Sequence, residues 1–438
     1  MYNPIIIVSS RGERMGKIKY IQRDTNGSIK LDAEYIGTDS AGKHMEYILT
    51  EENGKLILTP SIHSLSRLYI EPTSACNLNC VTCIRRTWSE KPGFMEMSAF
   101  NALVSQLKEF SSLESIMFGG FGEPMHHPEI FNMIAALKVL GLKVEITTNG
   151  TMLNKESFEK LFSSGLDTLW VSIDSTETST FNAIREGADF GGIHDNLKLF
   201  KRMNQESDKK MTLGIAFVAT KDNVDELSKL RSFAANVWAE KISVSNVIPY
   251  DREMESKMLC RKVLFKPLAY TKAEEERIGF KEIIIPEISL PRIDYNETTK
   301  DALHDIRGSM MKVKLLNETF KAYDDHCRFV HDRISFIRWD GMVSPCMGLL
   351  HSYTTFLNGN ERRMNEYTLG SIREKSLKEI WESSEYKEFR ESVYEFEFSP
   401  CVLCGGCKDI NSNEADCRTD SSPVCGGCLW AQGVIQCP

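Results

Sequence analysis

Three cysteines lie within eight residues in the stretch ACNLNCVTC, at positions 76, 80 and 83. Thiolate sulfur is a soft ligand that suits zinc, copper(I) and iron–sulfur clusters. A structural zinc site needs four protein ligands, and no fourth cysteine follows before Cys260. The spacing therefore leaves two interpretations of Cys76, Cys80 and Cys83. They belong to a zinc site completed by a distant residue, or they hold a four-iron cluster whose fourth iron is open to a small molecule.

Most of the other cysteines gather toward the end of the chain. Of the 13 cysteines, nine lie from position 327 onward: Cys327, Cys346, Cys401, Cys404, Cys407, Cys417, Cys425, Cys428 and Cys437. An odd total and repeated C-x2-C spacing favour metal binding over disulfide bonds. These nine thiols predict either iron–sulfur clusters or a pair of structural zinc sites. Cys260 stands alone, and we expect it to be an unreactive thiol.

The composition is that of an ordinary globular protein, with 438 residues, 42% of them hydrophobic and 26% charged. A formal net charge of −8 gives no attraction to nucleic acid or to anionic membranes. No run of 18 apolar residues predicts a transmembrane helix. The first residues lack the basic segment and the cleavage pattern of a signal peptide. We therefore expect a cytoplasmic protein with neither nucleic acid nor a membrane as its partner.

Residues 67–250 alternate short apolar strands with amphipathic helical segments. The strands read RLYIEPT, SIMFGGFG, KVEITTNG, TLWVSID, LGIAFVAT and ISVSNVIP. Such alternation is typical of parallel βαβ units. Six strands predict an α/β fold, either a partial (β/α)6 barrel or an open sheet. In both architectures the ligand site lies at the carboxyl ends of the strands.

Three further regions flank or follow this core. Residues 1–66 alternate apolar and polar positions around the turn signals TNGS and ENGK, which predicts a small antiparallel β region. Residues 251–326 lose the alternation and are interpreted as a bridging insertion. Residues 327–438 are interpreted as a domain for auxiliary clusters. Near its start lies DRISFIRWDGMVSPCMG (residues 332–348), a predicted hairpin that turns at DG. The last 38 residues contain few apolar side chains, so we expect bound metal to help hold them.

The C-x3-C-x2-C motif at the end of the first core strand resembles that of the radical S-adenosylmethionine (SAM) enzymes. This resemblance implies a [4Fe–4S] cluster on Cys76, Cys80 and Cys83, with SAM chelated at the open iron through its methionine amino and carboxylate groups. In that family an electron cleaves SAM to a 5′-deoxyadenosyl radical, which abstracts hydrogen from a substrate. One departure is Thr82, because family members often have an aromatic residue just before the third cysteine.

Other strand ends carry the same resemblance. GGFGEP is similar to the family's GGEP motif, whose backbone meets the SAM amino group, and glycine allows that close approach. Arg185 in FNAIREG resembles the arginine that pairs with the SAM carboxylate through its planar fork. Taken singly, such polar residues are as typical of caps and turns. Together the resemblance implies a SAM site built from Gly119, Gly120, Gly122, Glu123, Thr148, Asn149, Ser172, Asp174 and Arg185.

Residues 327–438, called the tail below, resemble the SPASM extension of radical SAM enzymes. In that extension further cysteines hold two auxiliary four-iron clusters. The match rests on Cys327-x13-Gly341-x4-Cys346. The later cysteines depart from the usual C-x2-C-x5-C-x3-C order. Two fully ligated clusters need eight cysteines and nine are present, so one thiol is spare or one cluster is bound differently.

Within this group, ACNLNCVTCIRRTW and the ending SPCVLCGGCKDINSNEADCRTDSSPVCGGCLWAQGVIQCP look most like the maturases associated with tungsten-dependent aldehyde ferredoxin oxidoreductases. That resemblance implies maturation of a tungsten pterin oxidoreductase or of its cofactor, with ferredoxin or flavodoxin as the low-potential electron donor. Other SPASM enzymes modify peptides or proteins by thioether or carbon–carbon crosslinks or by formylglycine formation, which is the alternative function. A non-catalytic electron carrier is a third hypothesis, but a carrier has no use for the GGFGEP loop.

Overall fold

The structure is a computed structural model of the chain. It describes residues 47–52, 55–260, 286–308, 311–315, 327–357, 359–399, 401, 411–418 and 422–438. Its centre is a ten-stranded sheet in the order β10-β9-β8-β7-β6-β5-β4-β3-β11-β12. Six consecutive parallel strands form the middle of that sheet: β3 (Arg67–Ile70), β4 (Ser115–Phe118), β5 (Lys143–Thr148), β6 (Thr168–Ser172), β7 (Thr212–Ala219) and β8 (Lys241–Asn246). These are the six predicted strands, and the predicted α/β fold is confirmed.

The sheet continues beyond both ends of the predicted core. At one end β9 (Glu287–Leu290) pairs in parallel with β8, and β10 (Lys312–Leu315) pairs in parallel with β9. Both strands come from the range interpreted as a bridging insertion. At the other end β11 (Ile334–Ile337) pairs in parallel with β3 and antiparallel with β12 (Val343–Ser344). The latter pair is the predicted hairpin, and Gly341 in its turn has a φ of 92°.

Two small antiparallel pairs stand apart from this sheet. The strands β1 (Tyr47–Glu52) and β2 (Lys55–Pro60) lie within the region predicted to be antiparallel β, whereas residues 1–46 lie outside the described residues. The second pair joins β13 (Tyr353–Leu357) to β14 (Asn360–Met364) in the tail.

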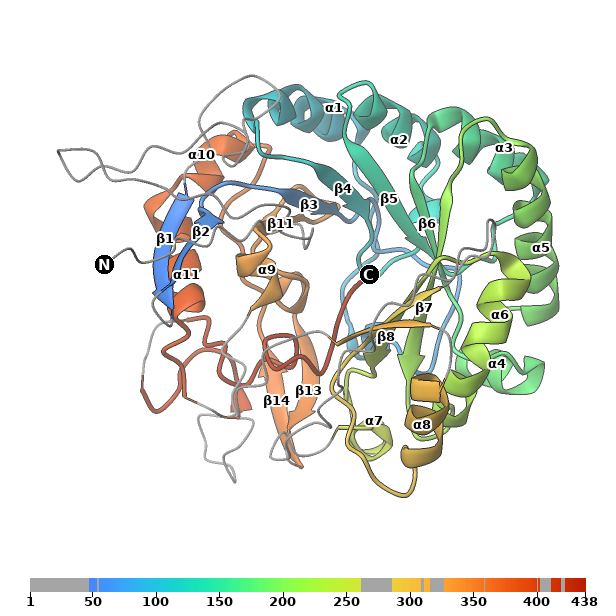
Figure 1. Cartoon of the computed structure of the whole chain (residues 1–438). Coiled ribbons are helices and arrows are strands. Elements are labelled where there is room, and N and C mark those ends of the chain that lie inside the picture. The colour runs from blue at the N-terminus through green and yellow to red at the C-terminus, as the bar shows by residue number, and fades with distance from the viewer. Residues whose placement is uncertain are drawn as a thin grey trace, which may run out of the picture.

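Helices follow the core strands and cover the outer face of the sheet. They are α1 (Met97–Gln106), α2 (Ile130–Lys138), α3 (Lys155–Ser164), α4 (Thr178–Ile184), α5 (Phe190–Glu206) and α6 (Leu230–Val237), with α7 (Arg252–Lys257) and α8 (Lys300–Gly308) beyond them. Local signals set their ends. Asn154 and Ser157 form a capping box at the start of α3, and Gly165 ends that helix in a left-handed conformation. Figure 1 shows helices α1, α2, α3, α5 and α6 as an arc outside the curved sheet.

Alternation along the strands divides the interior into two hydrophobic clusters. Successive side chains of a strand point to opposite faces, so Leu68 and Ile70 join the outer cluster between the sheet and its helices. Tyr69, between them, joins an inner cluster with Trp170 and with tail residues such as Phe336. The tail therefore packs on the inner face of the sheet and supplies most of the inner cluster.

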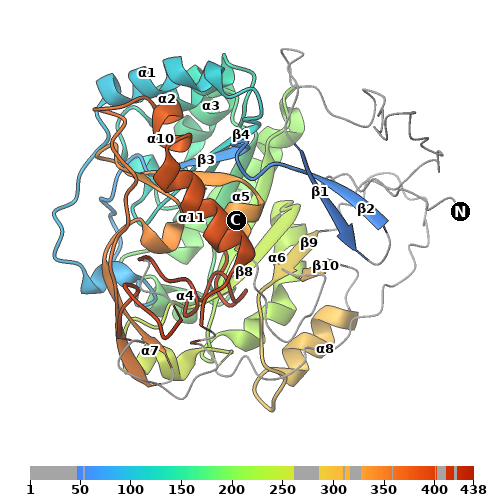
Figure 2. The same ribbon diagram turned by 90° about the vertical axis from the view of Figure 1, so that its left-hand side faces the viewer.

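The helices of the tail complete this packing: α9 (Arg328–His331), α10 (Leu377–Trp381) and α11 (Ser384–Glu395). Figure 2 views the molecule from the tail side, with α10 and α11 in front of the sheet. Tyr386 Oη donates to Ser335 Oγ at 2.9 Å, and Tyr69 Oη donates to the carbonyl oxygen of Pro438 at 2.7 Å. Among the described residues, no helix has the length and apolar character that crossing a bilayer requires.

Candidate active site

The loop that carries Cys76, Cys80 and Cys83 leaves the carboxyl end of β3 and crosses to α4. Backbone hydrogen bonds fasten it there, because Val81 N donates to Ile184 O at 2.8 Å and Asn79 N donates to Glu186 O at 3.2 Å. All three cysteines are half-buried. They are thus held in place while remaining open to a ligand.

The three thiols share one site. Burial raises the pKa of Cys80 to about 11, with the charges of Cys83 and Cys76 adding to the rise. Burial also raises the pKa of Cys83. Nevertheless, among the described residues no three cysteine, histidine or carboxylate side chains converge closely enough to hold one metal ion. A cluster fits this arrangement better than zinc does, because cluster cysteines ligate separate irons.

Two donors point at the sulfur of Cys76. Leu78 N donates to it at 3.5 Å and Asn149 Nδ2 at 3.8 Å. Asn149 Nδ2 also donates to Asn77 Oδ1 at 2.9 Å, and Asn77 Nδ2 donates to Thr151 Oγ1 at 2.8 Å. Asn149 therefore joins the end of β5 to the first cysteine. Asn77 and Thr151 were missed, since polar loop residues carry no distinctive sequence signal.

The GGFGEP loop packs directly on the backbone that leads to Cys76. An ideal Cβ on Gly122 would overlap the carbonyl oxygen of Thr73, and one on Gly120 would lie 2.6 Å from Glu71 Cγ. Gly120 also has a φ of 124°. Only glycine fits these two positions. At Gly119, by contrast, the nearest atom to such a Cβ is Met117 Cγ at 3.9 Å.

Glu123, buried at the end of this loop, ties two strand ends together. Its carboxylate accepts hydrogen bonds from Asn149 N at 2.6 Å, Thr148 Oγ1 at 2.7 Å and Met125 N at 2.9 Å. Burial raises the pKa of Glu123, and these hydrogen bonds oppose that rise. Since the donors already occupy the carboxylate, Glu123 holds the loop in position and leaves the loop backbone to face a ligand.

Asp174 and Arg185 form a buried ion pair next to the cysteines. Arg185 Nη2 lies 2.9 Å from Asp174 Oδ2, and Val218 N donates to Asp174 Oδ1 at 2.8 Å. Burial alone would lower the pKa of Arg185, but Asp174 and the thiols of Cys80 and Cys83 raise it. In the described part of the chain, Arg185 Nε has no hydrogen-bond partner. The guanidinium thus keeps one donor available beside the thiols.

Ser172, the last of the predicted site residues, lies at the same edge. Ser172 is half-buried and is the last residue of β6, two residues before Asp174. The structure brings all the predicted strand-end residues to the carboxyl edge of the sheet, around the cysteine loop.

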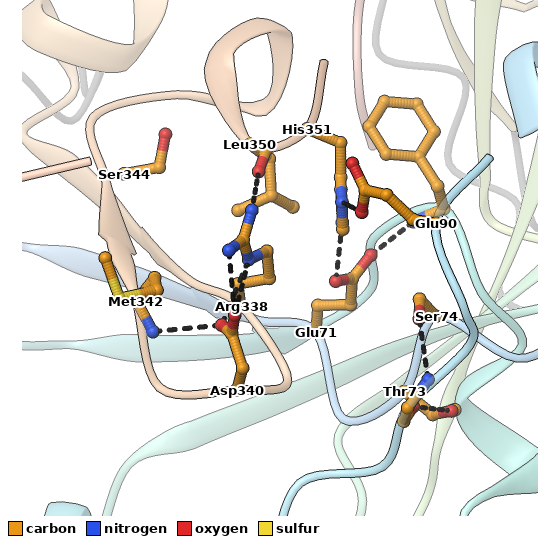
Figure 3. Close-up of polar contacts among 12 residues, drawn as sticks. Glu71, Thr73, Ser74, Glu90, Arg338, Asp340, Met342, Ser344, Leu350 and His351 are labelled. Carbon is orange, nitrogen blue, oxygen red and sulfur yellow. Dashed lines mark hydrogen bonds and ion pairs between the residues drawn. The ribbon is translucent and has the colours of Figure 1, made fainter. Parts of the chain in front are cut away.

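A buried histidine joins this edge to the tail. Figure 3 shows His351 between two carboxylates, with Nε2 2.8 Å from Glu71 Oε2 and Nδ1 2.9 Å from Glu90 Oε2. Trp88 packs on the imidazole at 4.3 Å between ring centroids. Phe121 N, in the GGFGEP loop, donates to Glu71 Oε1 at 3.0 Å. The cluster therefore ties the tail to both active-site loops, and no sequence motif signalled it.

We expect the His351 contacts to stabilise the fold most at low pH. Burial alone would lower the pKa of His351, but Glu71 and Glu90 raise it above its usual value. Charge-assisted hydrogen bonds contribute about 1.5–3 kcal/mol. That contribution is fully present below the unfolded-state pKa of about 6.5 and is lost as the pH rises through the folded-state value. Anaerobic urea unfolding should therefore separate His351→Gln from the wild type more at pH 6 than at pH 9. Equal differences at both pH values would contradict a charged His351.

The described tail cysteines fall into two groups and one isolated thiol. Burial raises the pKa of Cys327 to about 12, with the Cys428 thiol adding to the rise. Burial also raises the pKa of Cys346 well above its usual value, and Cys428, Cys327 and Cys425 add to it. Cys327, Cys346 and Cys425 are buried in the inner hydrophobic cluster and Cys428 packs against it, so these four thiols form one group.

The second group meets at Ser399. Cys401 N donates to Ser399 O at 2.7 Å, and Ser399 Oγ lies 2.9 Å from Cys417 Sγ. Cys404 and Cys407 lie outside the described residues.

Cys437 has different surroundings, at the amino ends of the strands. Arg328 Nη1 donates to Cys437 O at 2.8 Å. Cys437 also lines a cavity of about 360 Å³ together with Arg67 and Lys241, the first residues of β3 and β8. Burial raises the pKa of this thiol, and Arg328 opposes the rise. Cys260 is buried with a pKa raised by burial to about 12, which agrees with the expected unreactive thiol.

Comparison with known proteins identifies two domains in this chain. Residues 70–234 match the radical SAM superfamily, and residues 327–408 match SPASM, an iron–sulfur cluster-binding domain. The tungsten-containing aldehyde ferredoxin oxidoreductase cofactor-modifying protein of Pyrococcus furiosus is 29% identical over 376 residues, or 85% of this chain and 96% of that protein. An AdoMet-dependent heme synthase of Methanosarcina barkeri is 25% identical over 350 residues, covering 77% and 89% of the two chains.

A solved structure shares the fold. SuiB of Streptococcus suis, bound to the precursor peptide SuiA, superposes with a TM-score of 0.52 at 18% identity, covering 78% of this chain and 70% of SuiB. The predicted cofactors, iron–sulfur clusters and SAM, follow from the matched domains. The chain therefore combines a radical SAM domain with a SPASM domain and is an iron–sulfur enzyme.

Proposed function

We propose that this enzyme cleaves SAM reductively at Cys76, Cys80 and Cys83 and uses the resulting radical chemistry to mature a tungsten pterin oxidoreductase or its cofactor. The observation that carries the proposal is the grouping of three half-buried thiols with Asn149 and Arg185 at one strand edge. The tungsten assignment is supported by the Pyrococcus furiosus relative, of which this chain covers 96%.

Each residue of the site has a part in this proposal. Cys76, Cys80 and Cys83 would hold a [4Fe–4S] cluster, which when bound would supply the electron that cleaves SAM to a 5′-deoxyadenosyl radical. Arg185 offers its free Nε to the SAM carboxylate, while Asp174 holds the guanidinium in place. The backbone of the GGFGEP loop faces the SAM amino group, and Glu123 fixes that loop against β5. A low-potential ferredoxin or flavodoxin provides the electron.

The decisive experiment uses the protein purified and reconstituted anaerobically. Iron and zinc are counted, and 5′-deoxyadenosine is measured after addition of SAM with dithionite and then with reduced ferredoxin or flavodoxin. We expect the iron content of three four-iron clusters and formation of 5′-deoxyadenosine. Zinc in place of iron with no 5′-deoxyadenosine would overturn the proposal.

The substrate is tested separately by co-expression with a tungsten aldehyde oxidoreductase. We expect that oxidoreductase to be active with this enzyme and inactive with its Cys76→Ala variant. Oxidoreductase activity that is independent of this enzyme, together with a mass change in a candidate peptide, would instead support the peptide-modifying function.

Replacing Gly122 by alanine should weaken SAM binding. The added Cβ would overlap the carbonyl oxygen of Thr73, so the loop must move away from the cysteines. Overpacking of this kind costs about 1–3 kcal/mol, or roughly fivefold to 150-fold in affinity if SAM binding must supply it. Anaerobic calorimetry of SAM binding measures the change. Gly191→Ala, in the first turn of α5 and outside the predicted SAM site, is the control because its Cβ has room. Equal losses in both variants would contradict this role of Gly122.

A further inference from the structure

Arg362, in the middle of β14, is a buried arginine with two unsatisfied guanidinium nitrogens among the described residues. Its side chain is 1% exposed, and in the described part of the chain neither Nε nor Nη1 has a hydrogen-bond partner. Its neighbours Glu361 and Arg363 on the same strand are exposed. A guanidinium is always charged in proteins, and an unpaired buried charge is strongly unfavourable. A negative group is therefore expected beside it.

The guanidinium points into the turn between two cysteines. An ideal Cβ on Gly427 would overlap Arg362 Nη1 and would lie 2.7 Å from Cζ. Gly427 stands between Cys425 and Cys428, whose turn is closed by a hydrogen bond from Cys428 N to Cys425 O at 2.9 Å. Glycine at this position thus allows the guanidinium to lie directly against the turn between the two thiols.

These two thiols belong to the group of four. Cys327 precedes the first residue of α9, and Cys346 precedes the short helical turn Met347–Leu349. Both are buried in the inner hydrophobic cluster with Cys425, and Cys428 packs against it. Four thiols brought from three separate segments to one apolar site are a suitable ligand set for a four-iron cluster.

We propose that Cys327, Cys346, Cys425 and Cys428 hold one auxiliary [4Fe–4S] cluster, and that Arg362 donates hydrogen bonds to it and raises its reduction potential. The proposal rests on the cluster-binding function of the SPASM domain. Four thiolates give such a cluster a net negative charge, and reduction adds another. A buried cation stabilises the reduced form more than the oxidised form, since the attraction grows with the charge. Cys437 is then the spare ninth thiol.

The test is a redox titration of the anaerobic holoprotein followed by electron paramagnetic resonance. In Arg362→Gln we expect the iron content to be kept and one auxiliary cluster to become at least tenfold harder to reduce, a shift of about 59 mV to lower potential for one electron. Arg362→Lys keeps the positive charge, so the reduction potential of this cluster should lie between those of Arg362→Gln and the wild type. Arg363→Gln removes the same charge from an exposed position of the same strand and should leave every potential unchanged. Unchanged potentials in Arg362→Gln would overturn the role of Arg362.

A second pair of variants tests the ligand set even where Arg362→Gln fails to fold. Cys346→Ser should lose or alter the signal of one auxiliary cluster, while Cys437→Ser keeps the iron and the signals of the wild type. Loss of a cluster in Cys437→Ser would overturn the assignment. Formation of 5′-deoxyadenosine is measured in the same samples. Zinc in the tail together with normal SAM cleavage would refute the proposed auxiliary cluster without contradicting the proposed SAM cleavage.

Discussion

Cys80→Ala is expected to abolish formation of 5′-deoxyadenosine and to remove one of the three clusters. Cys80 lies between Cys76 and Cys83 in a loop that is fastened to α4 on both sides of it. Since the substitution leaves only the two thiols of Cys76 and Cys83 to hold the cluster, the cluster cannot be retained at full occupancy. The measurements are chromatographic quantification of 5′-deoxyadenosine and iron per chain, both under anaerobic conditions.

Cys260→Ala is the control for this prediction. Its thiol is buried apart from the strand-end site, so removal of sulfur there should leave both SAM cleavage and the iron content unchanged. If Cys80→Ala still produced 5′-deoxyadenosine at the wild-type rate, the cluster would have to be held elsewhere. The tail clusters should remain in Cys80→Ala, as judged from their resonance signals.

Arg185→Leu is expected to destabilise the fold by about 3–5 kcal/mol, because it strands the buried Asp174 carboxylate. Asp174 is 0% exposed, and burial raises its pKa while Arg185 opposes that rise. Anaerobic urea unfolding gives the change in stability. Adding Asp174→Asn to this variant should recover much of the loss, since the amide oxygen still accepts from Val218 N.

The double variant separates stability from ligand binding. If Arg185 contacts the SAM carboxylate, Arg185→Leu with Asp174→Asn regains stability but still binds SAM weakly in anaerobic calorimetry. Recovery of both properties would show that Arg185 serves only as the partner of Asp174.

The parts of this protein that sequence predicts well are those governed by local pattern. Strand and helix periodicities gave the six parallel strands of the core, and Gly341 marked the turn of the hairpin β11–β12. The predicted strand-end residues lie at one edge of the sheet because the carboxyl ends of parallel strands are on the same side. The loops after β3 and β4 are neighbours for the same reason, which brings Gly120 against Glu71 and Gly122 against Thr73.

Features that depend on distant segments could not be predicted. The strands β9 and β10 have four residues each, and their charged and proline-rich surroundings concealed them. His351 meets Glu71 across 280 positions, a separation that leaves no periodic trace in the sequence. Likewise, nothing in the segment NERRM distinguishes Arg362 from its charged neighbours. Its guanidinium packs against Gly427, which is distant in the sequence.

The parallel pairing of β3 with β11 has a consequence for how the enzyme can be divided. A fragment that ended near residue 250 would leave β3 with bare N–H and C=O groups on one side, which is a template for aggregation. It would also expose the inner face that the tail covers. The core strands β3–β8 and the tail should therefore unfold in a single cooperative transition. Because one continuous hydrogen-bonded sheet spans both, the separation between the SAM site and the tail clusters should stay constant through turnover, so that electron tunnelling between them needs no domain motion.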